Sequence, residues 1–164
     1  MDDILRPLGY LCLGSRLKRL GERLQAGVVQ LGRQRGLEVQ AGQFPILVTI
    51  DRLGPVTITD LAEALGVSQP GVTRNVAGLV AAGLVQTRRI HEDQRHKTLT
   101  LTKAGRQLVE RCKRDFWPRI EAVVAEICRG LSGSLLDQLA GLEDALAESS
   151  LDVRLGRDGQ EAAQ

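Results

Sequence analysis

Two short groups of polar residues between positions 68 and 97 could make specific contacts with a charged ligand. The first group combines hydroxyl, amide and guanidinium side chains and consists of Ser68, Gln69, Thr73 and Arg74. The second is mostly cationic and consists of Arg88, Arg89, Asp93, Arg95 and Lys97. Such donors bind phosphate oxygens and the edges of nucleic-acid bases. No acidic residue lies between Ser68 and Ile90, so nothing in that stretch would repel phosphates.

Two short helices are predicted to position the first group. Thr57 followed by Asp60 is an acid-for-glutamate form of the capping box, which satisfies unpaired backbone donors at a helix start. Gly66 can adopt the left-handed conformation that ends a helix. Ser68 is then expected to cap a second helix, with Pro70 in its first turn and Gly83 at its end.

The second helix should bury one face and expose the other. Its apolar positions recur at helical spacing and are Val72, Val76, Leu79 and Val80. The residues expected to look outward are Gln69, Pro70, Thr73, Arg74 and Ala77. This arrangement is typical of a helix-turn-helix recognition helix, although an ordinary amphipathic helix with a solvated face has the same pattern.

A charged hairpin is predicted to follow. Residues 84–90 and 98–101 read as strands, and the polar stretch 91–97 (HEDQRHK) joins them. In a DNA-binding wing, Arg95 would enter an adjacent minor groove and Asp93 would orient its guanidinium. The alternative is a solvated hairpin tip with a weak surface ion pair.

These residues resemble the MarR family of transcriptional regulators. The resemblance rests on the wing pattern Asp93-x-Arg95, on Leu99-x-Leu101-Thr102-x-x-Gly105, and on the run VTRNVAGLVAAGLV, over about fifty residues. It implies a mainly α (α+β) fold, a winged helix-turn-helix core with long N- and C-terminal dimerisation helices. It also implies a homodimer that binds double-stranded DNA at a pseudo-palindromic operator and acts as a repressor or, less often, as an activator.

The resemblance assigns roles to individual residues. Arg95 would enter the minor groove with the support of Asp93, and Gln69, Thr73 and Arg74 would form the recognition surface. Arg74 is the single cation of this helix, so we expect phosphate contacts from Arg88, Arg89 and Lys97 to dominate and affinity to fall with salt.

Long apolar stripes support a dimer. Residues Leu13, Leu17, Leu20, Leu24, Val28 and Leu31 recur at steps of three and four. A second long helix after Lys103 is expected to bend at Pro118, and a third begins at Ser134. The expected parts are an N-terminal arm (1–40), the DNA-binding core (41–105), C-terminal dimerisation helices (106–150) and a disordered tail (151–164). A monomeric bundle that buries these stripes internally is the alternative.

The charge distribution places any DNA contact in the core. The net charge is only +2, and residues 106–164 carry 8 basic against 11 acidic residues. A C-terminal region of that sign is a poor DNA binder. The chain has no apolar run of 18 or more residues and no basic leader at its start, so we expect a cytoplasmic protein without a membrane partner.

An effector and a redox signal are further expectations. The family's effector pocket implies a small phenolic or anionic aromatic ligand, with Arg16 as its candidate partner, although a solvated surface arginine is the simpler alternative. Some peroxide-sensing relatives carry a reactive cysteine in the first helix, which would be Cys12, with Cys128 near the place of a resolving cysteine. Those relatives have tyrosines nearby that this chain lacks. Cys112 and Cys128 otherwise read as small core residues.

Enzyme chemistry finds no support in the sequence. No glycine-rich phosphate loop, metal-ligand cluster or nucleophile elbow is present, so we expect no catalytic residues, cofactor or metal. A winged helix can also serve as a protein-protein assembly module without binding DNA, and in that case Arg74 and Arg95 would be dispensable.

Overall fold

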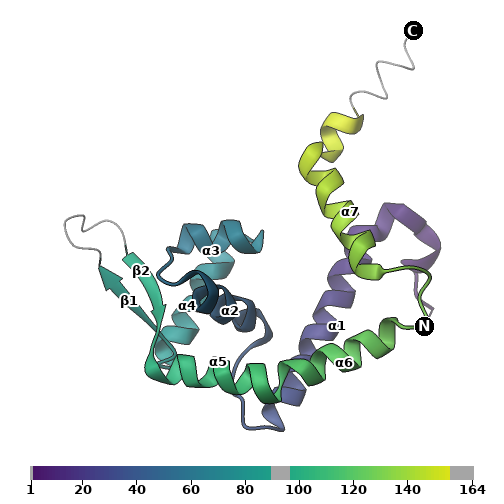
Figure 1. Ribbon diagram of the computed structural model, residues 1–164. Helices are drawn as coiled ribbons and strands as arrows, with labels where there is room; N and C mark the ends of the chain where they lie inside the picture. The colour runs from purple at the N-terminus through teal and green to yellow at the C-terminus, as the bar shows by residue number, and fades with distance from the viewer. Residues whose placement is uncertain (1, 90–96, 156–164) are drawn as a thin grey trace. The chain divides into compact units, whose positions relative to one another are not determined.

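The computed structural model describes residues 2–89 and 97–155 and is mainly helical with one small sheet (Figure 1). Its chain divides into two compact units, Met1–Ile120 and Glu121–Gln164. The elements in chain order are the 3-10 helix η1 (Arg6–Cys12), α1 (Leu13–Arg33), the 3-10 turn η2 (Ala41–Gln43), α2 (Phe44–Leu53), α3 (Ile58–Leu65), α4 (Gln69–Ala81), β1 (Val85–Arg89), β2 (Lys97–Leu101), α5 (Lys103–Asp115), α6 (Trp117–Cys128) and α7 (Leu135–Glu148).

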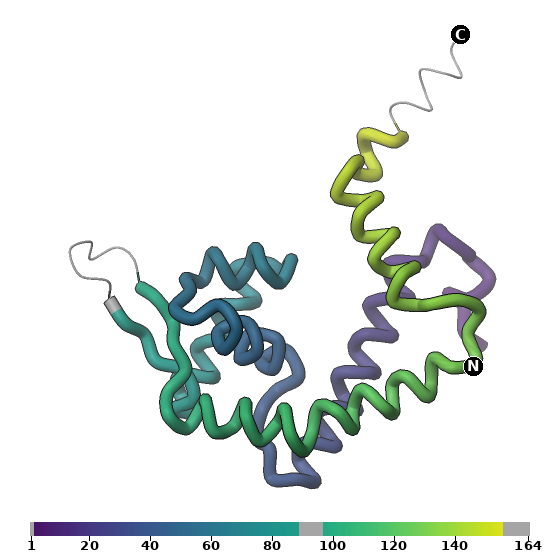
Figure 2. Tube along the Cα trace, in the orientation of Figure 1, coloured from purple at the N-terminus to yellow at the C-terminus, as the bar shows by residue number. Residues whose placement is uncertain are grey.

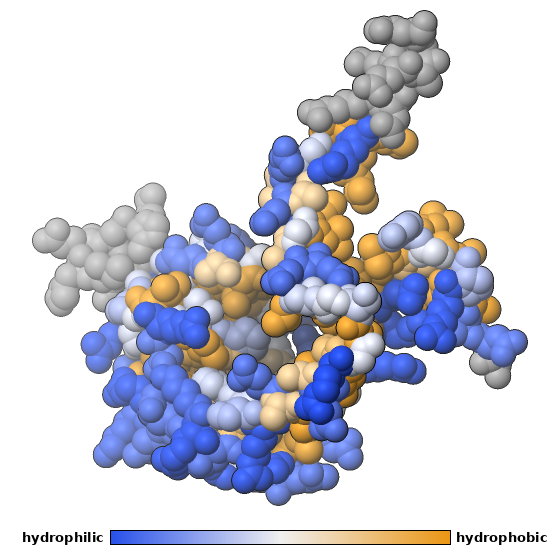
Figure 3. Space-filling model, turned by 45° about the vertical axis from the view of Figure 1, so that its right-hand side comes forward, coloured by the Kyte–Doolittle hydropathy of each residue, from blue (hydrophilic) through white to orange (hydrophobic). Residues whose placement is uncertain are grey.

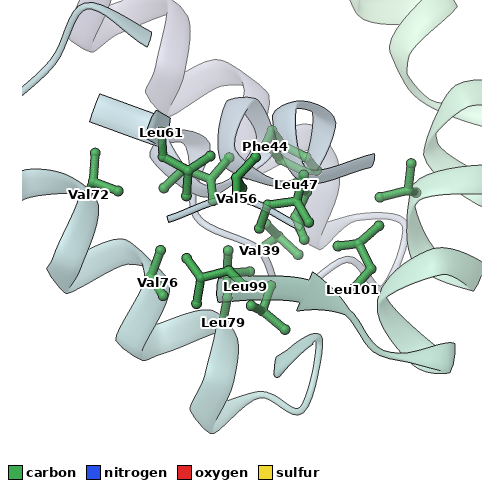
Figure 4. Packing of buried hydrophobic residues seen from close by; sticks show 14 of the residues in the cluster. Val39, Phe44, Leu47, Val56, Leu61, Val72, Val76, Leu79, Leu99 and Leu101 are labelled. Carbon is green, nitrogen blue, oxygen red and sulfur yellow. The ribbon is translucent and has the colours of Figure 1, made fainter. Parts of the chain in front are cut away.

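The core of the first unit lies between α2, α3, α4, the sheet and α5 (Figure 4). The expected inward residues of α4 are buried there, with Val72, Val76 and Leu79 between 0% and 6% exposed. Leu61 of α3 and Val109 of α5 are fully buried in the same cluster. Burial of such side chains stabilises a fold by about 1.5–3 kcal/mol each. The amphipathic pattern of the sequence therefore marks the core correctly at these positions.

The core includes residues that were expected to belong to the N- and C-terminal arms. Leu37 and Val39, counted with the N-terminal arm, are 3% and 4% exposed in the core. Cys112 and Phe116, counted with the C-terminal helices, are 1% and 2% exposed, and the Phe116 ring lies 5.8 Å from that of Phe44. Figure 2 shows the turn after α1 passing beside α5. Both core-facing segments thus belong to the compact unit that ends at Ile120.

The long helix predicted after Lys103 is divided into α5 and α6. The break falls at Phe116, whose backbone (φ −118°, ψ −56°) departs from regular helix, and Pro118 lies in the first turn of α6. Proline removes a backbone donor and restricts the residue before it, so a helix that meets it breaks or bends. The bend expected at Pro118 thus falls two residues earlier, at Phe116, the one residue that separates α5 from α6.

The sheet is an antiparallel hairpin, as predicted, with a third short pairing that the sequence did not reveal. β1 and β2 pair in the register Val85 opposite Leu101. Val56, just before α3, forms a bridge with Leu99, with N···O distances of 2.7 and 3.2 Å in the two directions. This pairing attaches the start of the helix-turn-helix to the sheet.

One predicted core position is wrong. Val80 was expected in the apolar stripe of α4 but is 41% exposed. It lies one position after the fully buried Leu79, and a step of one residue turns a helix by about 100°. The helix ends soon afterwards, and Gly83 has the left-handed backbone (φ 69°) expected of it.

The second unit contains the rest of α6 and α7. Ser134 caps α7 by accepting from the backbone N–H of Asp137 at 3.2 Å, as predicted from their spacing. Residues 151–155, expected to be disordered, are helical. Arg154 in this turn donates to the backbone carbonyl of Ser149 at 2.9 Å, which ties the turn to the end of α7. Within residues 2–89 and 97–155, no helix has the length and apolarity needed to cross a membrane.

Candidate nucleic-acid interface

The turn between α3 and α4 is held by local bonds that the sequence predicts. The Thr57 hydroxyl accepts from the Asp60 N–H at 3.1 Å, and the Asp60 carboxylate accepts from the Thr57 N–H at 2.7 Å. The bond from the Thr57 backbone lowers the pKa of Asp60 below its ordinary value. Gly66 ends α3 with φ 62° and ψ 30°, a left-handed conformation that glycine adopts without strain. These contacts fix the two ends of α3 and therefore the position at which α4 starts.

The outward face of α4 is polar and exposed at each expected position. The Gln69 side-chain amide donates to the Thr59 hydroxyl at 3.2 Å, which joins the first turn of α4 to α3. The Thr73 hydroxyl donates its proton to the Gln69 carbonyl at 2.9 Å. Its oxygen can therefore still accept a hydrogen bond from a ligand. Arg74 is exposed beside them. This face offers an amide, a hydroxyl and a guanidinium, and no carboxylate.

Ser68 occupies the predicted N-cap position but does not act as a cap. Its backbone is extended (φ −67°, ψ 139°), yet its side chain accepts no capping bond from α4. Pro70 has no backbone N–H, which removes one of the two donors that a capping hydroxyl normally serves. The Ser68 hydroxyl thus keeps its hydrogen-bonding capacity for a ligand.

The described part of the hairpin places cations on its strands. Arg88 and Lys97 are exposed, and Arg89 lies opposite Lys97 in the register of the sheet. Asp93 and Arg95 lie outside the described residues, so their expected roles stay predictions.

Gln43 is a positioning residue that the sequence reasoning missed. Its side-chain Nε2 donates to the backbone carbonyl of Asn75, in the middle of α4, at 3.3 Å. Its Oε1 accepts from the Gln40 N–H at 2.9 Å, which closes a capping box around η2. A Cβ on Gly78 would lie only 2.6 Å from Gln43 Nε2, so a larger residue there would push this amide away from α4. A glycine inside a helix was the one sequence signal of this contact.

Arg16 and Cys12 lie near the start of α1. Arg16 is half-buried and lines an open hollow with Asp3, Arg6, Leu13, Leu17, Arg19, Leu20 and Arg23. Arg19 forms a two-bond ion pair with Asp3, at 2.8 and 3.0 Å, and this bonding lowers the pKa of the carboxyl to about 2. Cys12 is half-buried at the junction of η1 and α1.

The other two cysteines differ from each other. Cys112 is 1% exposed, as expected of a small core residue, and burial raises the pKa of its thiol. Cys128 was expected in the core as well but is only half-buried, because it lies in the last turn of α6, outside the core cluster. All three cysteines are free thiols. Among the described residues, no three metal-binding side chains gather at one point.

Part of the chain matches a known protein family, and several solved structures share its fold. Residues 35–96, from the turn after α1 to the hairpin loop, match the MarR family. A cysteine-to-serine variant of MarR from E. coli, complexed with operator DNA, is 22% identical with a TM-score of 0.65, over 90% of this chain and 98% of that one. BldR from Sulfolobus solfataricus is also 22% identical with a TM-score of 0.65, over 91% and 100%.

BpsR from Bordetella bronchiseptica, whose DNA binding is regulated by 6-hydroxynicotinic acid, is 24% identical with a TM-score of 0.66, over 84% of this chain and 94% of that one. Identities at this level show a shared fold, and the family match covers the helix-turn-helix and β1 of that fold. Over residues 35–96 the chain is therefore similar to the MarR family, and it shares the winged-helix fold of these solved regulators.

Proposed function

We propose that this protein binds double-stranded DNA in a sequence-specific way and represses transcription as a homodimer on a pseudo-palindromic operator. The observation that carries the proposal is the exposed, acid-free face of α4, with Gln69, Thr73 and Arg74 on it. A recognition helix reads base edges in the major groove through its N-terminal residues, which are the ones exposed here. Gln43 and Thr59 hold this helix from two neighbouring elements.

Phosphate contacts should supply most of the affinity. Arg74 is the one cation among the exposed residues of α4, whereas Arg88, Arg89 and Lys97 all lie on the strands of the wing. Each phosphate neutralised by such a group releases condensed counterions, so binding weakens steeply with salt. Arg95 would add a minor-groove contact at the wing, as the family resemblance implies.

The homodimer is proposed from apolar side chains left exposed by both units. Leu20 and Leu24 of α1 are 49% and 39% exposed, and Leu136 and Leu146 of α7 are 77% and 44% exposed. Figure 3 shows apolar surface beside polar surface along α7, the helix that leads to the grey C-terminal residues. Exposed apolar stripes of this kind mark interaction surfaces, and a second copy offers the same stripes in return.

An effector is proposed at the hollow that Arg16 lines. Three further arginines, Arg6, Arg19 and Arg23, line the same hollow, and Asp3 is its one acidic residue. The ion pair with Asp3 occupies Arg19, which leaves Arg6, Arg16 and Arg23 for an anion. BpsR, which shares the fold, responds to the anionic aromatic 6-hydroxynicotinic acid. A small anionic aromatic ligand therefore suits this chain by charge.

DNA binding can be tested by fluorescence anisotropy with promoter fragments from the gene's own neighbourhood and with fragments selected from a random library. The variants are Arg74→Ala, Arg95→Ala and, as a control, Arg114→Ala, which removes a cation at the far end of α5. We expect Arg74→Ala and Arg95→Ala to weaken specific binding by about 1–3 kcal/mol each. The control should bind like the wild type.

A failure of the wild type to select any sequence would overturn the proposal. The same fold would then be read as a protein-protein assembly module, in which neither arginine matters. If wild type and Arg74→Ala bound DNA equally well, the protein would still be a DNA-binding protein, but Arg74 of α4 would not take part in recognising the sequence.

A further inference from the structure

A second cationic hollow, of about 310 Å³, lies where the end of α1 meets α5 and the start of α6. It is distinct from the hollow at Arg16 and from the recognition face of α4. Three arginines, one carboxylate and two apolar side chains line it, namely Arg35, Arg111, Arg119, Asp115, Leu37 and Phe116. These residues come from two parts of the sequence, 35–37 and 111–119, which the fold brings together.

The single carboxylate of this hollow is already paired. Arg114, which does not line the hollow, binds Asp115 through Nε at 3.0 Å and Nη2 at 2.9 Å. This bonding, together with the charges of Arg111 and Arg119, lowers the pKa of Asp115, so the group stays ionised near neutral pH. Within the described residues, Arg35, Arg111 and Arg119 make no ion pair. Three positive charges thus surround the hollow without a partner of their own.

Two of the three arginines are anchored by the backbone. Arg111 Nη2 donates to the carbonyl of Arg35 at 2.6 Å, across a separation of 76 residues, and Arg35 Nη1 donates to the carbonyl of Leu31 at 3.4 Å. A guanidinium has five N–H donors, so one such bond leaves most of them for a ligand. A planar group held in this way is well suited to bidentate bonding with carboxylate or phosphate.

The apolar residues indicate what kind of anion fits. Leu37 and Phe116 are only 3% and 2% exposed, so a ligand would meet mainly the arginine and aspartate side chains of the lining. Its volume exceeds the space of a single small oxyanion, and its charge favours more than one negative group on the ligand.

The hollow is also distant from the wing. Arg111 and Arg119 follow Lys103, the first residue of α5, by 8 and 16 positions, which corresponds to about 12 and 24 Å along the helices. The phosphates of DNA bound at the wing therefore belong to a different site.

We propose that Arg35, Arg111 and Arg119 form a binding site for a small polyanion, a metabolite with two or more carboxylate or phosphate groups. The site does not depend on DNA binding, and its test needs no DNA. An anion held by Arg35 and Arg111 would join the end of α1 to α5, beside the bond that already links them.

Isothermal titration calorimetry and thermal unfolding of the full-length protein can test this, with citrate, inorganic phosphate and acetate at equal ionic strength. We expect affinity to fall in the order citrate, phosphate, acetate, and citrate to raise the unfolding temperature beyond an ionic-strength control. Tight binding of phosphate but not citrate would assign the site to phosphorylated ligands, and the reverse would assign it to polycarboxylates.

Variants separate this site from general surface charge. Arg119→Gln and Arg35→Gln should each weaken citrate binding about fivefold or more, because each loses a charge-assisted bond. Asp115→Asn should strengthen binding severalfold by removing the one negative charge of the hollow, a gain that structural damage would not produce. Arg52→Gln, an exposed arginine of α2 outside the hollow, is the control. Equal affinity of all these variants, or no citrate binding by the wild type, would overturn the proposal.

Discussion

The side-chain amide of Gln43 donates to the backbone carbonyl of Asn75, 32 residues later, at 3.3 Å. The same side chain accepts from Gln40, so one amide group joins the turn before α2 to the middle of α4. Asn75 follows Arg74 directly, and its own Nδ2 donates to the Gly71 carbonyl at 3.0 Å. Movement of the segment that links α1 to α2 would thus be transmitted to the proposed recognition helix.

Gly78→Ala tests this contact. The new Cβ would lie 2.6 Å from Gln43 Nε2, so either the amide or α4 must move. Nε2 is the free end of a flexible side chain, so we expect it to swing aside and lose its bond to Asn75. The unfolding free energy should then fall by no more than about 1 kcal/mol, and DNA binding should weaken. In a Gln43→Ala background the clash is gone, and the same substitution should stabilise the helix by up to about 1 kcal/mol. Urea unfolding of the four proteins would reveal this reversal of sign, and additive effects would contradict it.

Gly105→Ala should be more damaging. A Cβ at this position would overlap the backbone carbonyl of Leu84, which a side-chain rotation cannot relieve. We expect a loss of about 3 kcal/mol or more in unfolding free energy. Gly27→Ala in α1, where a Cβ meets open space, is the matched control and should be neutral or stabilising by up to about 1 kcal/mol. Similar stability of the two variants would contradict the close approach of Gly105 to the Leu84 carbonyl.

The capping box of α3 predicts a pH dependence. The pKa of Asp60 is lowered in the folded state, so its contribution is complete above the ordinary carboxyl pKa of 3.8 and is lost as the pH falls through the folded value. Asp60→Asn should therefore lower stability at pH 7, with a difference from wild type that shrinks below pH 3.8. Denaturant unfolding from pH 7 to pH 2.5 would measure it, and a constant difference would rule out the ionised carboxylate as the cause.

Salt dependence should identify the phosphate contacts of the wing. Arg88→Ala and Lys97→Ala should each reduce the slope of log Kd against log salt by about 0.9, and weaken binding to all sequences equally. Arg74→Ala should instead alter the preference among sequences. Titrations over salt with the operator and with an unrelated duplex distinguish the two effects. An unchanged slope in Arg88→Ala would exclude this residue from the interface.

The exposed leucines of α1 and α7 predict that a charged residue in their place weakens the proposed homodimer. Leu20→Glu and Leu136→Glu place a carboxylate in the proposed dimer surface and should shift sedimentation from dimer towards monomer. Leu53→Glu, on the end of α2 and 60% exposed, is the control and should leave the dimer intact. Monomeric wild type at micromolar concentration would refute the homodimer directly.

Much of the winged helix could be predicted because its signals are local. The Thr57–Asp60 box, the turn at Gly66 and the cap at Ser134 each depend on residues within four positions of one another, and the structure confirms them. Helical spacing also predicted the buried and exposed faces of α4, with Val80 as the exception. Such features arise from backbone hydrogen bonding and side-chain direction, which the chain determines without distant contacts.

Other features were decided by tertiary packing. Val56 pairs with Leu99, Gln43 with Asn75, and Arg111 with the Arg35 carbonyl, over separations of 43, 32 and 76 residues. No local pattern encodes these partners, because each depends on how helices meet across the core. By itself the sequence determined the winged-helix elements and the polar face of α4. Only the folded chain decided what holds that face in place, and it alone gathered three arginines around one hollow.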